Sequence, residues 1–184
     1  MPEHPDRGDD PTDEALIARW QGGDERAASV LVQRHAGAVG RYVSSLGEHD
    51  GVEEVVQDTF VRAFSSLDSF RGESSLRTWL FTIARRLVVD RRRAARRQRV
   101  VGSVEDIDLA TEYTALDALI ANEAGQRVRD AVDRLSPTQR EVFLLRVNEG
   151  MSYRDIAAVV GTTEGAARVH YHNALRTVKE SLYV

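Results

Sequence analysis

The last third of the chain, residues 135–182, constrains the fold most, because turn residues divide it into three short helical segments. Ser136 followed by Pro137 is typical of a helix start, with the Ser side chain as cap and Pro in the first turn. Gly150 and Gly161 end the first two segments, and Gly161 has the freedom to adopt the positive φ of a tight turn. This layout is typical of a helix-turn-helix, whose second helix enters the DNA major groove. An ordinary three-helix bundle is the alternative.

Helical periodicity accounts for the rest of the chain as well. We expect the three C-terminal helices at about 138–147, at 153–160 and from 164 onward, the third capped by Thr162 and Thr163. Upstream, apolar residues recurring every three or four positions predict helices over about 13–21, 25–46, 52–67, 76–88 and beyond, and 115–135. No stretch alternates at period two for long enough to predict a strand. The predicted fold class is therefore all-α.

Charge is distributed unevenly, although the formal net charge is only −4. Residues 71–99 hold ten Arg and two acids, whereas residues 103–124 hold six acids and no basic residue. Eight of these Arg lie in residues 85–99, where the apolar stripe stops after Val88, so this part of the helix should project into solvent. Like charges repel one another unless a polyanion neutralises them. The pattern favours nucleic acid as a partner over a merely solvated charged face.

Composition excludes several kinds of site. The chain has no Cys, which excludes disulfides, thiolate zinc sites and cysteine redox sensors. No apolar run approaches the ~20 residues of a membrane helix, and the acidic N-terminus does not resemble a secretory signal, so we expect a cytoplasmic protein. His170 and His172 are two residues apart on a helix, so they do not face one another as metal ligands would. Without a nucleophile elbow or a phosphate-binding Gly loop, we expect no enzyme, no cofactor and no small-molecule substrate.

Two helical blocks on either side of an acidic stretch resemble a known family. Residues 52–93 and 135–182 are similar to the two regions retained by the extracytoplasmic-function (ECF) group of bacterial RNA polymerase sigma factors. Composition predicts a disordered N-terminus at 1–11 and an acidic flexible linker at 100–117. The resemblance implies a region 2 helical domain at 12–99 and a region 4 helix-turn-helix domain at 118–184. It implies a factor that binds core polymerase and directs it to promoters by recognising −10 and −35 elements.

The resemblance also implies which residues make these contacts. Glu54, Gln57 and Asp58 would dock on the β′ clamp of core polymerase, and the β flap would be a second contact. The −10 element would be recognised and melted by Phe70, Arg71, Ser74, Arg77, Arg85, Arg86, Arg92 and Arg93, with Phe70 either stacking on a base or filling the core. The −35 element would be read by Thr163, Arg168, Val169, His170, His172 and Asn173, since Arg can pair with guanine and Asn with adenine.

Two other interpretations stay open, and each has a different partner. The chain could be a conventional helix-turn-helix regulator that binds duplex DNA as a dimer, or an adaptor whose Arg-rich helix binds RNA or an acidic protein. If the family resemblance holds, an anti-sigma factor is an expected partner, because family members are commonly inhibited in this way. The chain's lack of cysteines, a metal cluster or a ligand motif fits control by such a partner.

Overall fold

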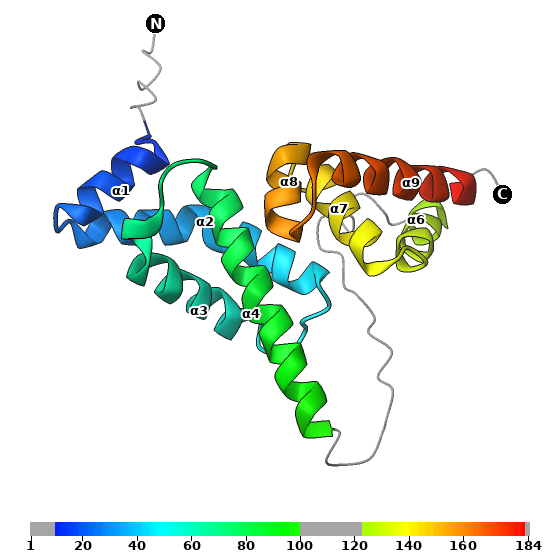
Figure 1. Cartoon of the computed structure of the whole chain (residues 1–184), viewed down its shortest axis with the longest axis horizontal. Helices are drawn as coiled ribbons and strands as arrows, with labels where there is room; N and C mark the ends of the chain where they lie inside the picture. The colour runs from blue at the N-terminus through cyan, green and yellow to red at the C-terminus, as the bar shows by residue number, and fades with distance from the viewer. Residues whose placement is uncertain (1–9, 100–122, 183–184) are drawn as a thin grey trace, which may run out of the picture. The chain divides into compact units, whose positions relative to one another are not determined.

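Residues 10–99 and 123–182 are described by a computed structural model, and they form helices joined by turns and short connections (Figure 1). The elements in chain order are α1 (Asp13–Gln21), α2 (Glu25–Ser45), α3 (Val52–Ser65), the 3-10 helix η1 (Leu67–Ser69), α4 (Leu76–Arg99), α6 (Glu123–Asp133), α7 (Pro137–Val147), α8 (Tyr153–Val160) and α9 (Glu164–Leu182). No strand occurs among these described residues, which confirms the all-α prediction. The expected linker at 100–117 lies outside them, as does most of the N-terminus that we expected to be disordered.

The chain divides into two compact units, Met1–Gly37 and Ala38–Val184, and the boundary falls within α2. In the first unit, Leu16 and Ile17 of α1 are buried. Arg34 of α2 pairs with the Asp13 carboxylate at 2.7 Å, and His35 Nε2 lies 2.8 Å from the other oxygen of that carboxylate. These two contacts tie the first turn of α1 to α2.

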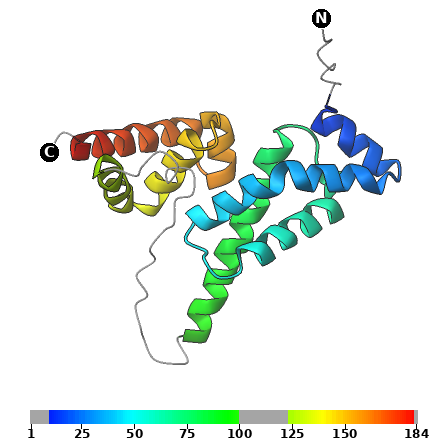
Figure 2. The same cartoon turned by 180° about the vertical axis from the view of Figure 1, so that it is seen from behind.

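In the second unit, α3 and α4 lie side by side, as the views from front and back agree (Figures 1 and 2). The buried residues of α3 are Val55, Thr59, Phe60 and Ala63, and those of α4 include Leu76, Leu80, Phe81, Ala84, Leu87 and Val88. Apart from Phe81, which the periodicity did not predict, these positions belong to the apolar stripes that the 3.6-residue period predicted. Burying them drives the two helices together. None of the described helices is long and apolar enough to cross a membrane.

Helices α7, α8 and α9 form the helix-turn-helix that the sequence predicted. The Ser136 hydroxyl accepts from the backbone N–H of Gln139 at 3.4 Å, and the Gln139 side chain accepts from the backbone N–H of Ser136. This reciprocal capping box starts α7 where the Ser-Pro pair indicated. Ser152 caps α8, and Gly161 adopts φ +77° between α8 and α9, as expected.

A hydrophobic core holds α6, α7 and α9 together. Its buried members are Ala131, Val132, Leu135, Phe143, Leu144, Ala174 and Val178. Tyr171 of α9 packs on its edge with its ring 6.1 Å from that of Phe143. This packing fixes α9 and thereby orients the exposed face of its first half.

Candidate nucleic-acid interface

The arginines beyond Val88 in α4 fall into two groups, and the first group holds the fold together. Arg91 Nη1 lies 2.9 Å from a Glu54 carboxylate oxygen, and Arg91 Nε lies 3.3 Å from Glu48. Arg92 donates to the backbone carbonyl of Leu46, just after the end of α2. We counted only the acids within residues 71–99 against this run of positive charge, so the acids that α4 meets from earlier in the chain were missed.

The second group is exposed and available to an anion. Arg93, Arg96 and Arg97 are exposed on α4, and so is Arg86, which lies shortly before Val88. Arg93 is paired with Asp90 over a long 3.9 Å, and both side chains are about two-thirds exposed. Such an exposed pair contributes at most about 1 kcal/mol, so a phosphate can compete for Arg93. The solvent-exposed cationic helix that the sequence predicted is present from Arg93 to Arg97.

Arg85 is half-buried and engaged by an acid of α7. Its Nε donates to Glu141 Oε1 at 2.8 Å, and the Tyr42 hydroxyl donates to the same oxygen at 2.6 Å. Burial, reinforced by the negative charge of Glu141, raises the pKa of Tyr42 well above its ordinary value. Burial alone lowers the pKa of Arg85, but hydrogen bonding and attraction to Glu141 outweigh it, and the net pKa is raised.

Arg77 is held in a similar way, about two turns before Arg85 on α4. It forms an ion pair with Glu149, whose side chain is only 4% exposed, and its guanidinium lies 5.5 Å from the centre of the Phe81 ring. Arg41 is a second, longer partner of Glu149 at 3.7 Å. Two arginines that we expected to contact the promoter are thus paired with acids of this chain.

Sequence reasoning missed Glu141 and Glu149 as partners. A signal existed for Glu141, because it precedes the apolar run 142–145 and shares a helical face with Leu145. A carboxylate at such a position is buried when the helix packs, so it needs a hydrogen-bond donor from another part of the chain. Glu149 carries no comparable pattern, since it lies in the turn after α7.

The loop between η1 and α4 presents the remaining candidate −10 residues. The Phe70 ring lies 5.1 Å from that of Trp79, and both side chains are half-buried. Phe70 therefore packs against the fold while part of its surface stays open to solvent. Arg71 is exposed, Ser74 is half-buried, and Gly72 between them adopts φ +69°, which turns the loop.

The candidate polymerase-binding residues share the outward face of α3. Gln57 and Asp58 are exposed, and the Glu54 side chain is 64% exposed even though it pairs with Arg91. Val61 lies one turn further along this face, and its side chain is 57% exposed. The sequence analysis did not identify Val61 as a candidate. A single exposed apolar residue is common on protein surfaces, so Val61 adds an apolar contact to this face without marking an interface by itself.

The candidate −35 residues gather on the first half of α9. Thr163 caps the helix, because its hydroxyl accepts from the backbone N–H of Ala166 at 3.1 Å. Arg168 is exposed and pairs with Glu164 at 3.0 Å. Val169, at 57% exposure, and His172 are also exposed, whereas His170 and Asn173 are half-buried.

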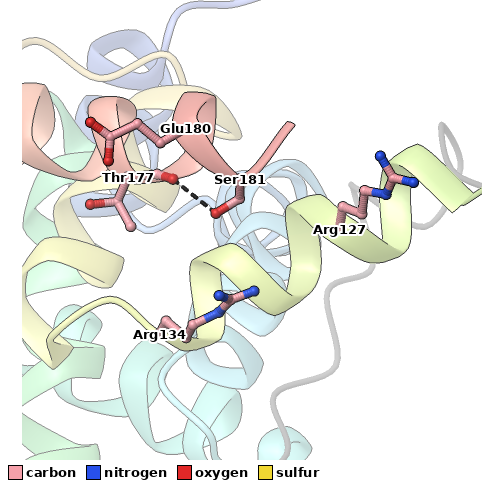
Figure 3. A pocket seen from close by; sticks show the side chains of 5 residues that line it. All are labelled: Arg127, Arg134, Thr177, Glu180 and Ser181. Atoms are coloured by element: carbon pink, nitrogen blue, oxygen red, sulfur yellow. Dashed lines mark hydrogen bonds between the residues drawn. The ribbon is translucent and has the colours of Figure 1, made fainter. Parts of the chain in front are cut away.

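The described residues also contain a hollow of about 570 Å³ between α6 and α9 (Figure 3). Its walls are formed by Arg127 of α6, by Arg134 directly after α6, and by Thr177, Glu180 and Ser181 of α9. The Ser181 hydroxyl donates to the Thr177 carbonyl at 3.0 Å, so it is engaged with its own helix. No group of acids and histidines that could hold a metal ion occurs in the described part of the chain.

Comparison with known proteins matches both helical regions of the chain to one family. The family model described as sigma-70 region 2 matches residues 31–98, and that described as sigma-70, region 4 matches residues 125–178. The ECF RNA polymerase sigma-E factor of Haemophilus influenzae is 32% identical over 184 residues, which cover 93% of this chain and 95% of that protein. The protein of the same name from Escherichia coli K12 is 31% identical over 91% of this chain and 92% of its own length.

The chain belongs to the ECF group of RNA polymerase sigma factors. It directs RNA polymerase in promoter recognition, and as a sigma factor it is an initiation factor without enzymatic activity. The matches to regions 2 and 4 confirm the predicted fold and favour this interpretation over a dimeric regulator or an adaptor.

Two solved structures extend the comparison. The sigma factor RpoE from Bartonella quintana, in complex with the anti-sigma factor NepR, has a TM-score of 0.66 and 28% identity to this sigma factor, over 85% of this chain and 96% of that one. CnrH in complex with the cytosolic domain of CnrY has a TM-score of 0.65 and 30% identity, over 92% and 96% of the two chains.

Proposed function

We propose that the outward face of α3, formed by Glu54, Gln57, Asp58 and Val61, binds the β′ clamp of core polymerase in the cytoplasm. The single observation that carries this assignment is that these four residues make one continuous exposed stripe, opposite the buried stripe of α3. An exposed apolar residue surrounded by acids suits a basic partner surface that also offers an apolar contact.

Recognition and melting of the −10 element are assigned to the η1–α4 loop and to α4. Phe70, at the partly open end of the loop, offers a ring on which an unstacked base can stack. We assign Arg71 and Ser74 to the strand around that base, and Arg86 and Arg93 to the DNA backbone further along α4. Arg77, Arg85 and Arg92 would join once their present partners release them. Single-stranded DNA is bound in this way by stacking together with a positive groove.

Recognition of the −35 element is assigned to the first half of α9. Arg168 and Asn173 supply donors suited to guanine and adenine edges, His170 and His172 add further donors, and Val169 offers an apolar contact for a thymine methyl group. Thr163 acts at the helix start, where backbone N–H groups can also meet a phosphate. The C-terminal domain would contact the β flap of the polymerase as well.

The polymerase assignment is tested by two substitutions on α3 that leave its buried stripe intact. Gln57→Ala and Asp58→Arg should preserve helicity and the melting temperature, because both side chains are exposed. Each should weaken binding to core polymerase, Asp58→Arg more strongly because it reverses a charge. Asp68→Arg, at an exposed position in η1, is the matched control for the charge reversal. Unchanged core binding by both α3 variants would refute the assignment.

An anti-sigma factor is proposed as the regulator of this sigma factor. One support is the solved structure of RpoE from Bartonella quintana in complex with the anti-sigma factor NepR. The other is that α3 and α4 have exposed surfaces that such a partner could cover. Purification of the chain from cells grown without an inducing stress should recover an inhibitor that competes with core polymerase. Recovery of the chain only free or polymerase-bound, under every growth condition, would argue for control by synthesis instead.

A further inference from the structure

One aromatic ring connects all three helices of the helix-turn-helix. Tyr153, the first residue of α8, has the guanidinium carbon of Arg146 at 4.9 Å from its ring centre and that of Arg168 at 5.0 Å. Arg146 belongs to the last turn of α7, and Arg168 lies one turn into α9. Both distances fall within the ~6 Å range of a cation–π interaction.

The Tyr153 ring is held in place from two sides. The ring of Tyr171 lies 5.9 Å away in an edge-on arrangement and itself packs against the hydrophobic core. Arg146 is also fixed, because its Nη1 donates to the Met151 carbonyl at 2.6 Å, two residues before Tyr153. The ring therefore offers a rigid surface to Arg168, whose side chain is otherwise exposed and paired with Glu164 one turn earlier.

A fixed guanidinium matters for reading DNA. Arg recognises guanine through two parallel hydrogen bonds, so the plane of its guanidinium must match the base edge. A long exposed side chain loses rotamer freedom when it adopts that geometry, and a surface that restricts it beforehand lowers this loss. A tyrosine ring stacks well with a guanidinium plane and restricts it in this way.

We propose that Tyr153 is a positioning residue that holds Arg168 in the orientation needed to read the −35 element. This inference rests on the proposed role of Arg168 as a base-reading residue. Tyr153 acts through its ring, and its hydroxyl is not required. The inference predicts a coupling between Tyr153 and Arg168 that a role of Tyr153 in folding alone does not produce.

The test is a double-mutant cycle in the holoenzyme, with DNA first selected from a pool randomised across the −35 region. Arg168→Ala should abolish preference at one or two base pairs, which tests the proposed function by itself. Tyr153→Leu should weaken binding by about threefold to fivefold at those same base pairs, as expected for loss of one exposed cation–π contact. It should have no further effect in the Arg168→Ala background. Tyr153→Phe, which keeps the ring, should behave like the unaltered protein.

Three outcomes would overturn the inference. An equal effect of Tyr153→Leu with and without Arg168 would assign Tyr153 a purely structural role. A Tyr153→Phe variant as weak as Tyr153→Leu would show that the hydroxyl contacts DNA directly. Unchanged base preference in Arg168→Ala would show that Arg168 does not read the −35 element, so both its proposed function and this inference would be wrong.

Arg154→Ala, which alters an exposed neighbour of Tyr153 on α8, is the matched control. If Tyr153→Leu lowers the melting temperature, Tyr153→Met replaces it.

Discussion

At the scale of single residues, the Glu141 carboxylate is buried and held by two donors. Burial of a charge is costly unless donors surround it, and one Glu141 oxygen accepts from both Tyr42 and Arg85. Tyr42 is also stacked on Phe81, with the ring centres 4.7 Å apart, so its hydroxyl has little freedom to move away. These residues should behave as one coupled group.

The raised pKa of Tyr42 predicts a specific loss of stability at alkaline pH. Above the ordinary Tyr pKa of 10.0, the unfolded chain releases the phenol proton while the folded chain keeps it. Stability from this group is therefore complete below pH 10.0 and falls as the pH rises toward the higher folded pKa. Tyr42→Phe should show a shallower decline in the free energy of unfolding across that range, measured by urea titration. Parallel declines in the two proteins would contradict the prediction.

At the scale of elements, α4 combines a structural half and a binding half. Its apolar stripe packs on α3 as far as Val88, Arg91 and Arg92 tie its middle to earlier segments, and Arg93 to Arg97 face solvent. The arginine-rich sequence alone does not divide these roles. The division depends on which Arg meets an acid or a carbonyl when the helices pack.

Arg92→Ala and Arg93→Ala should therefore differ, although the two residues are neighbours. Arg93→Ala should leave the melting temperature unchanged. It should also reduce the magnitude of the slope of log affinity against log salt concentration for promoter binding, because one phosphate contact is lost. The expected change is about 0.9 on duplex DNA, or about 0.7 on single-stranded DNA. Arg92→Ala should also lower the melting temperature, because the Leu46 carbonyl loses its donor. Thermal melts and salt titrations of holoenzyme–promoter binding measure both. Identical behaviour of the two variants would argue against a structural role for Arg92.

Features that depend on neighbouring residues could be predicted from the sequence, whereas contacts between distant residues could not. Helix positions and caps depend on residues within one turn of each other, so Ser136, Gly161 and the stripe of α3 were predicted correctly. The contacts of Arg91 with Glu48 and Glu54 join residues about forty positions apart, and spacing along the chain carries no signal for them. Residue roles toward DNA and polymerase came from the family resemblance and stay predictions.

At the scale of the whole molecule, intramolecular pairing and promoter binding compete for the same side chains. Arg77 and Arg85 are both expected to meet DNA phosphates, and in this structure they are paired with Glu149 and Glu141. A buried carboxylate neutralises the charge of a guanidinium paired with it, so that guanidinium attracts a DNA phosphate less strongly. Promoter binding through these two arginines should therefore be weaker while the acids hold them.

Neutralising Glu141 should shift this competition toward DNA. Glu141→Gln keeps an oxygen acceptor for Tyr42 and removes the charge that holds Arg85, so some stability should be lost. Binding of the free chain to a promoter fragment should tighten, and the slope of log affinity against log salt should steepen by about 0.9 as Arg85 gains a phosphate. Fluorescence anisotropy across a salt series measures both quantities.

The control for this prediction is Glu25→Gln, which changes the net charge equally at an exposed position on α2. A general charge effect would strengthen DNA binding to the same extent in both variants and leave the two slopes alike. Release of Arg85 would instead steepen the slope in Glu141→Gln alone, and the added Arg85→Ala substitution would remove the gain. If Glu141→Gln binds promoter DNA no better than the unaltered chain, the pairing with Arg85 does not restrain promoter binding, and Arg85 has a structural role.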